Sequence, residues 1–122
     1  MEKEKTEDEI LAELKERHSA MVEAYLGAGK NRDVFYIVLP GTELGFVLKK
    51  DISMDTYKKV SNMQAYHFMN PSKGVGLVDA GEMIFEECLI PGAIDQKILE
   101  SRYLLADCYM PCNALIEELK KN

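Results

Sequence analysis

The fold is decided by residues 77–119, whose sequence is LVDAGEMIFEECLIPGAIDQKILESRYLLADCYMPCNALIEEL. Apolar side chains recur in this stretch at spacings of three to five, which is the periodicity of a helix rather than of a strand. Pro91-Gly92 interrupts the pattern. We therefore predict two helices joined by a hinge, one from residue 77 or 79 to 89 and one over 95–121 with Asp95 as its N-cap. Two such apolar helices must pack against the rest of the chain.

A β-hairpin is the clearest prediction in the N-terminal half. Residues 33–39 (DVFYIVL) and 44–50 (LGFVLKK) are rich in β-branched and aromatic residues, and the turn sequence PGTE lies between them. Such apolar strands must be covered on at least one face, and the C-terminal helices are the expected cover. If only one face is covered, the strand edges stay open to pairing with another subunit. The predicted fold class is thus α+β, mainly helical, with one hairpin packed on C-terminal helices.

The first helix is predicted to start at a capping box, Thr6 to Glu9, and to run to about Leu26. Gly27 and Gly29 supply the backbone geometry that ends helices. Its apolar stripe is interrupted by a polar stretch at residues 15–18, so it is expected to dock by its second half only or on another chain.

A further helix is expected from the Ser53 N-cap to about Tyr66, followed by a turn-rich loop over 70–76. Pro111 falls inside the last helix, where proline removes a backbone hydrogen bond and clashes with the preceding turn. That helix should kink near Asp107 or restart at Pro111. We expect a single domain of residues 1–122, comprising a partly independent helix within 1–29, the hairpin at 33–50 and a helical block at 53–121.

Charge and hydropathy narrow the functional classes. The chain has 15 basic and 21 acidic residues and a net charge of −6, which argues against nucleic acid as a partner. No apolar run approaches the roughly 20 residues that a membrane helix needs, and the acidic N-terminus does not resemble a signal peptide. We therefore expect a cytoplasmic protein, in a bacterium or in a host cell.

The three cysteines, Cys88, Cys108 and Cys112, are the most tempting candidates for chemistry. With His18 or His67 they could form a zinc site of three sulfurs and one imidazole. The four-residue spacing of the last two is not that of a zinc knuckle or of a redox C-x-x-C motif. We expect buried thiols, and neither a metal nor another cofactor.

The remaining polar residues predict no reaction. His18 and His67 lack a nucleophile or carboxylate at motif spacing, and we expect surface or interface roles for them. The acidic residues Glu82, Glu86, Glu87 and Glu100 lack the Glu-x-x-His pairing of di-metal bundles and are expected to form a solvated face. We therefore expect a protein that is not an enzyme. An enzyme or a ligand-binding protein that uses His67 and residues 108–112 is kept as an alternative.

The order of elements resembles that of the small tail assembly chaperones of long-tailed bacteriophages and prophage remnants. Those proteins have a short hairpin ending in a basic residue, a capped helix, a polar loop, and helices divided by a Pro-Gly step. The stretches that carry the resemblance are FVLKK (46–50) with Ser53, AGEMI (80–84), CLIPG (88–92), LLA (104–106) and LIEEL (115–119). The long acidic first helix and Pro111 depart from that pattern.

The resemblance implies a non-enzymatic protein that oligomerises and coats an apolar tape-measure protein until the tail tube polymerises. An adaptable surface could come from methionine, although core filling is expected for most of the residues Met21, Met54, Met63, Met69, Met83 and Met110. The residues expected to bind the partner are Leu11, Leu14, Met21, Tyr25, Phe35, Ile37 and Phe46. The alternative is a cytosolic adaptor or regulatory domain that binds one partner through the helix at 6–26.

Overall fold

The computed structural model describes residues 4–27, 34–73 and 76–121. In chain order the elements are α1 (Glu7–Arg17), α2 (Ser19–Gly27), β1 (Val34–Val38), β2 (Gly45–Lys49), α3 (Met54–Met69), the 3-10 turn η1 (Pro71–Lys73), α4 (Gly76–Cys88), β3 (Leu89–Ile94), α5 (Gln96–Leu99), α6 (Arg102–Asp107), α7 (Tyr109–Cys112) and α8 (Ala114–Lys120).

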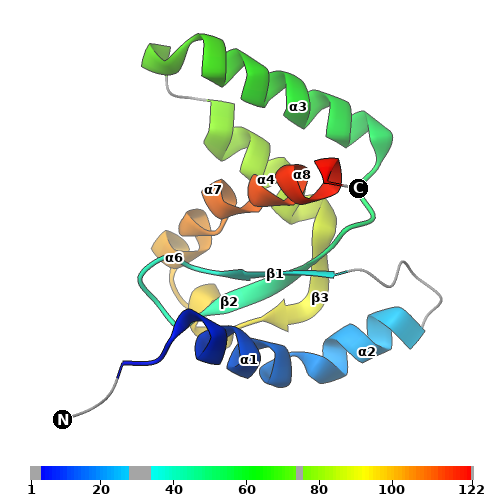
Figure 1. The fold of residues 1–122 in the computed structure, drawn as a ribbon, viewed down its shortest axis with the longest axis vertical. Coiled ribbons are helices and arrows are strands. Elements are labelled where there is room, and N and C mark those ends of the chain that lie inside the picture. The colour runs from blue at the N-terminus through cyan, green and yellow to red at the C-terminus, as the bar shows by residue number, and fades with distance from the viewer. Residues whose placement is uncertain (1–3, 28–33, 74–75, 122) are drawn as a thin grey trace.

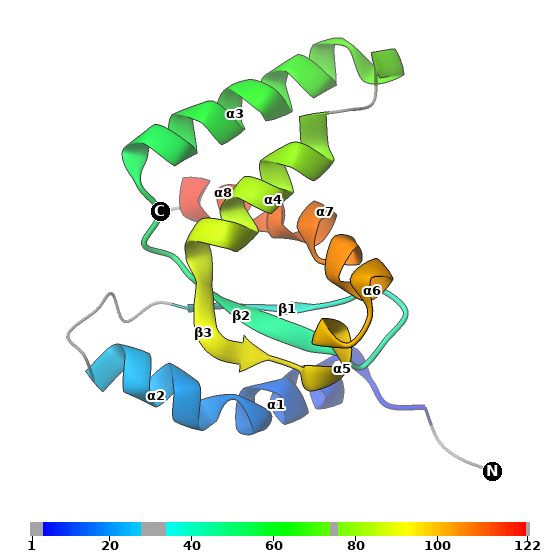
Figure 2. The same cartoon turned by 180° about the vertical axis from the view of Figure 1, so that it is seen from behind.

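The elements form three layers (Figures 1 and 2). A three-stranded antiparallel sheet in the order β1-β2-β3 lies in the middle. Helices α1 and α2 lie against one face, and α4, α7 and α8 cover the other, with α3 packed outside α4. The predicted α+β class is confirmed, and the expected cover of the hairpin by C-terminal helices is present.

The predicted hairpin is confirmed as β1 and β2. Val34 pairs with Lys49, and the register continues to Val38 with Gly45. The Leu39 N–H donates to the Leu44 carbonyl oxygen at 2.8 Å, which closes the hairpin before the turn. Alternate residues of β1 therefore face opposite layers, as strand geometry requires. Asp33, the first residue of the predicted strand, lies outside the described residues.

The predicted hinge at Pro91-Gly92 is wrong, because residues Leu89–Ile94 form the third strand of the sheet. Proline is tolerated there because β3 is an edge strand, where a missing N–H removes no ladder bond. Gly92 adopts φ +81°, and the register with β2 shifts between Phe46 and Leu48. These features bend the strand. The chain therefore changes direction within β3, on its way along the edge of the sheet from α4 to α5.

The helix predicted over 95–121, with a kink near Asp107 or a restart at Pro111, is divided into α5, α6, α7 and α8. Asp95 occupies the N-cap position of α5, but its side chain makes no capping bond. Ser101 caps α6 by accepting from the Leu104 N–H. Helix α6 ends at Asp107. Pro111 has no N–H to donate to the Asp107 carbonyl oxygen four residues earlier, so the expected break near Asp107 is confirmed.

The first helix has the predicted capping box, in which the Thr6 side chain accepts from the Glu9 N–H and the Glu9 side chain accepts from Thr6. It is interrupted at His18, which separates α1 from α2. Leu14 of α1 and Val22 of α2 are both buried against the sheet. The expectation of docking by the second half only is therefore wrong. Gly29 lies outside the described residues.

Helices α3 and α4 form an antiparallel pair above the sheet (Figure 1). The Ser53 N-cap is confirmed, since its side chain accepts from the Thr56 N–H. Glu87 of α4 reinforces this cap, with its carboxylate accepting from the Ser53 N–H at 2.7 Å and from the Thr56 hydroxyl at 2.8 Å. Glu87 is thus not part of the expected solvated face, whereas Glu86 is exposed. Of the loop predicted at 70–76, residues 74–75 are not described.

Two separate apolar clusters lie on the two faces of the sheet. The cluster under α4 and α7 is the larger and contains Ile37, Leu39, Phe46, Leu48, Val60, Ala80, Ile84, Phe85, Cys88, Ile94, Ile98, Cys108, Cys112, Leu115 and Ile116. The cluster on the α2 face contains Val22, Val47, Ile90 and Ala93, with Tyr25, Leu26, Val34 and Tyr36 packed against it. Most of the core therefore lies on the α4 side.

Candidate functional site

The carboxylate of Asp95 is the centre of the most connected polar cluster among the described residues. Arg17 donates to it twice, from Nε to Oδ1 at 2.9 Å and from Nη2 to Oδ2 at 2.8 Å. The Gly45 N–H donates to Oδ2 at 2.8 Å, and His18 Nε2 lies 2.9 Å from Oδ1. Because an ionised carboxylate only accepts, Nε2 carries the proton of that bond. We call Arg17, His18, Gly45 and Asp95 the carboxylate hub.

The hub is buried, with Asp95 8% and His18 7% exposed. Burial alone would raise the pKa of Asp95, but the bonds from Arg17 and from the Gly45 amide outweigh it and hold that pKa below its ordinary value. Its bonds run between α1, the α1–α2 junction, β2 and the end of β3. The hub therefore ties the N-terminal helices to the sheet. His18 is a buried partner of a carboxylate rather than the expected surface residue.

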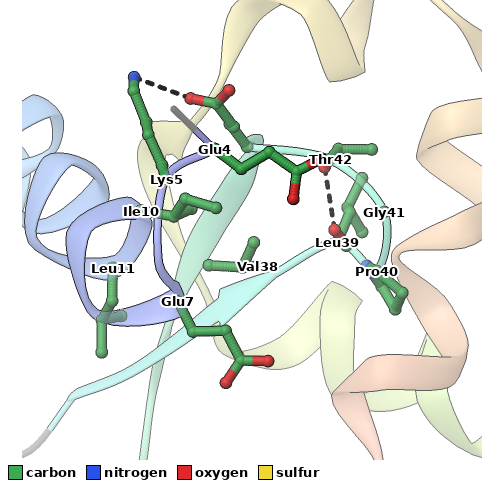
Figure 3. Close-up of a pocket in the computed structure, with 11 residues that line it drawn as sticks. Glu4, Lys5, Glu7, Ile10, Leu11, Val38, Leu39, Pro40, Gly41 and Thr42 are labelled. Carbon is green, nitrogen blue, oxygen red and sulfur yellow. Dashed lines mark hydrogen bonds and ion pairs between the residues drawn. The ribbon is translucent and has the colours of Figure 1, made fainter. Parts of the chain in front are cut away.

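A wide groove of about 1200 Å³ lies between the start of α1 and the end of β1 (Figure 3). Its apolar lining comes from both elements and from the turn, namely Ile10, Leu11, Val38, Leu39 and Pro40. Its polar lining is mainly acidic, with Glu4, Glu7 and Glu43 beside Lys5. We call this concavity the β1 groove.

Among the described residues that line the β1 groove, Lys5 is the only cation, and it is already neutralised. Lys5 Nζ lies 2.9 Å from Glu13 Oε2 and 2.9 Å from Glu43 Oε1. No ion pair joins Glu4 or Glu7 to any other described residue. The rim of the groove therefore carries net negative charge, which favours a cationic or apolar occupant over an anionic one.

A second surface lies at the outer end of the α3–α4 pair. In the last turn of α3, Tyr66 is 53%, Phe68 86% and Met69 79% exposed, and Val78 in the first turn of α4 is 43% exposed. A concavity of about 400 Å³ lined by Met63, Tyr66 and Asp79 lies between the two helices. We call Tyr66, Phe68, Met69 and Val78 the apolar tip.

The three cysteines are buried free thiols, as expected. Burial raises the pKa of Cys88 and of Cys108 to about 12, and it raises the pKa of Cys112 further. Cys108 and Cys112 donate to the helix carbonyl oxygens of Leu104 and Cys108. Across the described ranges 4–27, 34–73 and 76–121, no three His, Cys, Asp or Glu side chains are grouped to hold a metal.

The residues expected to bind a partner are not gathered on one surface. Leu14, Ile37 and Phe46 are buried core residues, and Phe35 packs against the same core. Tyr25 is half-buried in the α2 cluster. Leu11 lines the β1 groove and Met21 is 47% exposed. These last two are the predicted binding residues that the fold leaves most accessible.

The methionine prediction is partly wrong. Core filling was expected for most of them, but four of the six internal methionines are exposed, namely Met21, Met54, Met69 and Met110. Met63 and Met83 are packed against the core.

The apolar tip was overlooked by sequence reasoning, although the run Tyr66-His67-Phe68-Met69 directly before a proline-containing loop could have indicated it. An apolar run at a helix end leaves some side chains beyond the reach of the core.

No protein-family model matches the chain, and no curated protein or solved structure matches it. In the described part of the chain, no helix has both the length and the apolar character needed to cross a membrane.

Proposed function

We propose that this chain is a non-enzymatic, tail assembly chaperone-like protein that binds and shields an apolar segment of a partner, such as a tape-measure protein, in the cytoplasm. The carrying observation is the apolar tip, where Phe68 and Met69 are 86% and 79% exposed. Several large apolar side chains exposed at one end of a helix pair are typical of a surface that is covered by another protein.

The exposed methionine of the apolar tip supports the same proposal. A thioether side chain has three rotatable bonds and repacks against differently shaped apolar partners. Met69 belongs to the tip and is 79% exposed, whereas Met54 lies at the other end of α3, outside the tip. A shielding protein gains from such adaptability because its client presents many apolar segments rather than one fixed shape.

The adaptor alternative, in which the helix at 6–26 inserts into a partner's groove, has less support. The apolar residues Leu14 and Val22 of that helix pack on the chain's own sheet. Arg17 and His18 are engaged with Asp95. Binding through this helix would require that these contacts be broken first.

The proposal is tested by diluting an apolar tape-measure segment from denaturant and following its aggregation by light scattering. The wild-type chain should suppress aggregation at a stoichiometric ratio. The double variant Phe68→Ser/Met69→Ser should need about tenfold more protein, because burying these two side chains against the client should contribute at least about 1.4 kcal/mol, or about one decade in affinity.

The matched control is Met54→Ser, at the opposite end of the same helix and 65% exposed. It should suppress aggregation as the wild type does. Failure of the wild-type chain to suppress aggregation would overturn the proposal. Equal losses in the tip variant and the Met54 control would show that the tip is not the binding surface. The oligomer that the resemblance implies is measured in the same samples by static light scattering.

A further inference from the structure

The two edges of the sheet differ in how they resist pairing with another strand. The β3 edge contains Pro91, a glycine with positive φ at position 92, and an irregular register with β2. Proline, bulges and charges are the usual protection of an edge strand. The β1 edge, VFYIV over Val34–Val38, contains none of them, and no strand among the described residues pairs with its outer side.

Two hydrogen bonds establish which backbone groups of β1 face outward. The Leu39 N–H donates to the carbonyl oxygen of Leu44, the residue before β2. The carbonyl oxygen of Gly45, the partner of Val38, accepts from the Asp95 N–H on the opposite side of β2. Since antiparallel pairs alternate between bonded and non-bonded, Phe35 and Ile37 face β2. The N–H and C=O groups of Val34, Tyr36 and Val38 therefore point to the open edge.

The β1 groove runs beside this edge. Val38 lies on one side of the groove and Ile10 of α1 on the other (Figure 3), and Leu11 and Leu39 also line it. Side chains alternate between the faces of a strand, so a strand added to β1 would direct every second side chain toward α1 and into the groove. Main-chain bonds would supply affinity, and the apolar walls would select the side chains.

The charge around the groove indicates the flanking residues of a bound segment. The rim residues Glu4, Glu7 and Glu43 are acidic, so a segment with basic flanking residues would meet complementary charge. In a symmetric β1–β1 dimer the two strands run antiparallel, so the acidic rims lie at opposite ends of the pair and do not face each other. The groove therefore favours a segment with basic flanks, and light scattering tests for a β1–β1 dimer.

We propose that β1 and the β1 groove bind an extended apolar segment of a partner protein, flanked by lysine or arginine, as a fourth strand of the sheet. This inference rests on the proposed function and names the form in which the client is held. The apolar tip then serves as a second contact for the same client, on the other side of the sheet.

The probe is a synthetic peptide of nine alternating valine and threonine residues with two lysines at each end. Amide exchange followed by NMR should show that Tyr36 and Val38 exchange freely in the unliganded protein and become protected on binding. The amides of Phe35 and Ile37 should be protected in both states, because they already bond to β2.

Two modified peptides separate the contributions. A peptide with glutamates in place of the lysines should bind at least about tenfold more weakly at low salt, because the rim is acidic. A peptide N-methylated at alternate residues on its bonding edge should lose binding, because it lacks the main-chain donors. Neither peptide requires any change to the protein.

Val38→Lys adds a charge to the open edge and should weaken binding of the lysine-flanked peptide at least about tenfold. Met110→Lys, at an exposed position on α7, is the control and should bind as the wild type does. If the chain suppresses client aggregation and the Val38 variant does so equally well, the β1 inference fails while the proposed function stands.

Three other outcomes would overturn the inference. One is peptide binding without protection of Tyr36 and Val38. Another is equal binding of the N-methylated peptide. The third is a dimer, seen by light scattering without peptide, in which these two amides are already protected. If the lysine-flanked peptide is bound and client aggregation is not suppressed, the strand site stands and the proposed function fails.

Discussion

The two faces of the sheet are held to their helices by different forces. On the α4 face, large apolar side chains interlock: Phe46 and Phe85 pack edge to face with ring centroids 5.4 Å apart, and Phe85 meets Tyr109 in the same way at 5.6 Å. On the α1–α2 face, the cluster around Val22 is small. The carboxylate of Asp95 supplies the additional connection there.

The difference teaches where the fold depends on shape and where it depends on charge. Apolar packing is lost through a change of volume and is indifferent to pH in the ordinary range. A buried carboxylate that accepts from Arg17, His18 and Gly45 is lost through a change of charge. The N-terminal helices should therefore be the part of the fold that responds to polar substitution and to acid.

Gly81→Ala should have the largest effect on the free energy of unfolding, because it disturbs the close packing of helices on the α4 face. A Cβ at this position would overlap the backbone carbonyl oxygen of Tyr109, so α4 and α7 would have to separate. We expect a loss of about 3 kcal/mol in the free energy of unfolding. Urea unfolding followed by far-UV circular dichroism measures it.

The matched control is Gly27→Ala, where an added Cβ meets nothing within 4 Å. Its effect should stay below about 1 kcal/mol. Equal stability of the Gly81 variant and the wild type would show that α4 and α7 are not in close contact in solution.

Asp95→Asn should have the next largest effect, confined to the charge-dependent face. The neutral side chain loses its ionic bonds with Arg17 and leaves one buried donor of the hub without an acceptor. We expect about 2 kcal/mol of destabilisation, with faster amide exchange in α1 and α2 than in α4. The exposed Asp107→Asn is the control and should change neither quantity. Uniformly faster exchange in all helices would contradict the division between the two faces.

The elements that could be predicted from the sequence are those specified by neighbouring residues. The capping box at Thr6, the N-cap at Ser53 and the hairpin around Pro40 each depend on side chains within a few positions of one another. β3 could not be predicted in this way. Its short apolar run matches a helix as well as a strand, and only its pairing with β2, some forty residues away in the sequence, decides between them.

The candidate surfaces were harder to predict, because each depends on tertiary contacts. Asp95 was interpreted as a helix cap, and Arg17 and His18 as parts of a polar stretch. Arg17 and His18 lie 78 and 77 residues from Asp95 in the sequence, so no local pattern predicts the contacts of the hub. Phe46 was expected on a binding surface because strand periodicity does not reveal whether a second helical layer covers its face.

The smallest expected effect is the acid dependence of the hub. Burial raises the pKa of Asp95, while the bonds from Arg17 and the Gly45 amide lower it, and the net result is a pKa below the ordinary value of 3.8. A depressed folded-state pKa means that the hub stabilises the fold fully above the unfolded-state pKa and loses that contribution as the pH falls through the folded-state value.

The gap in unfolding free energy between the wild type and Asp95→Asn should therefore be constant from about pH 7 to about pH 5 and should narrow below about pH 4. Because both proteins share every other carboxylate, this difference isolates Asp95. The chemical shift of the Gly45 amide, which donates to Asp95 Oδ2, should titrate over the same acidic range. A gap that stays constant down to about pH 2 would show that the charge of Asp95 does not hold the N-terminal helices, and that the small cluster around Val22 holds them instead.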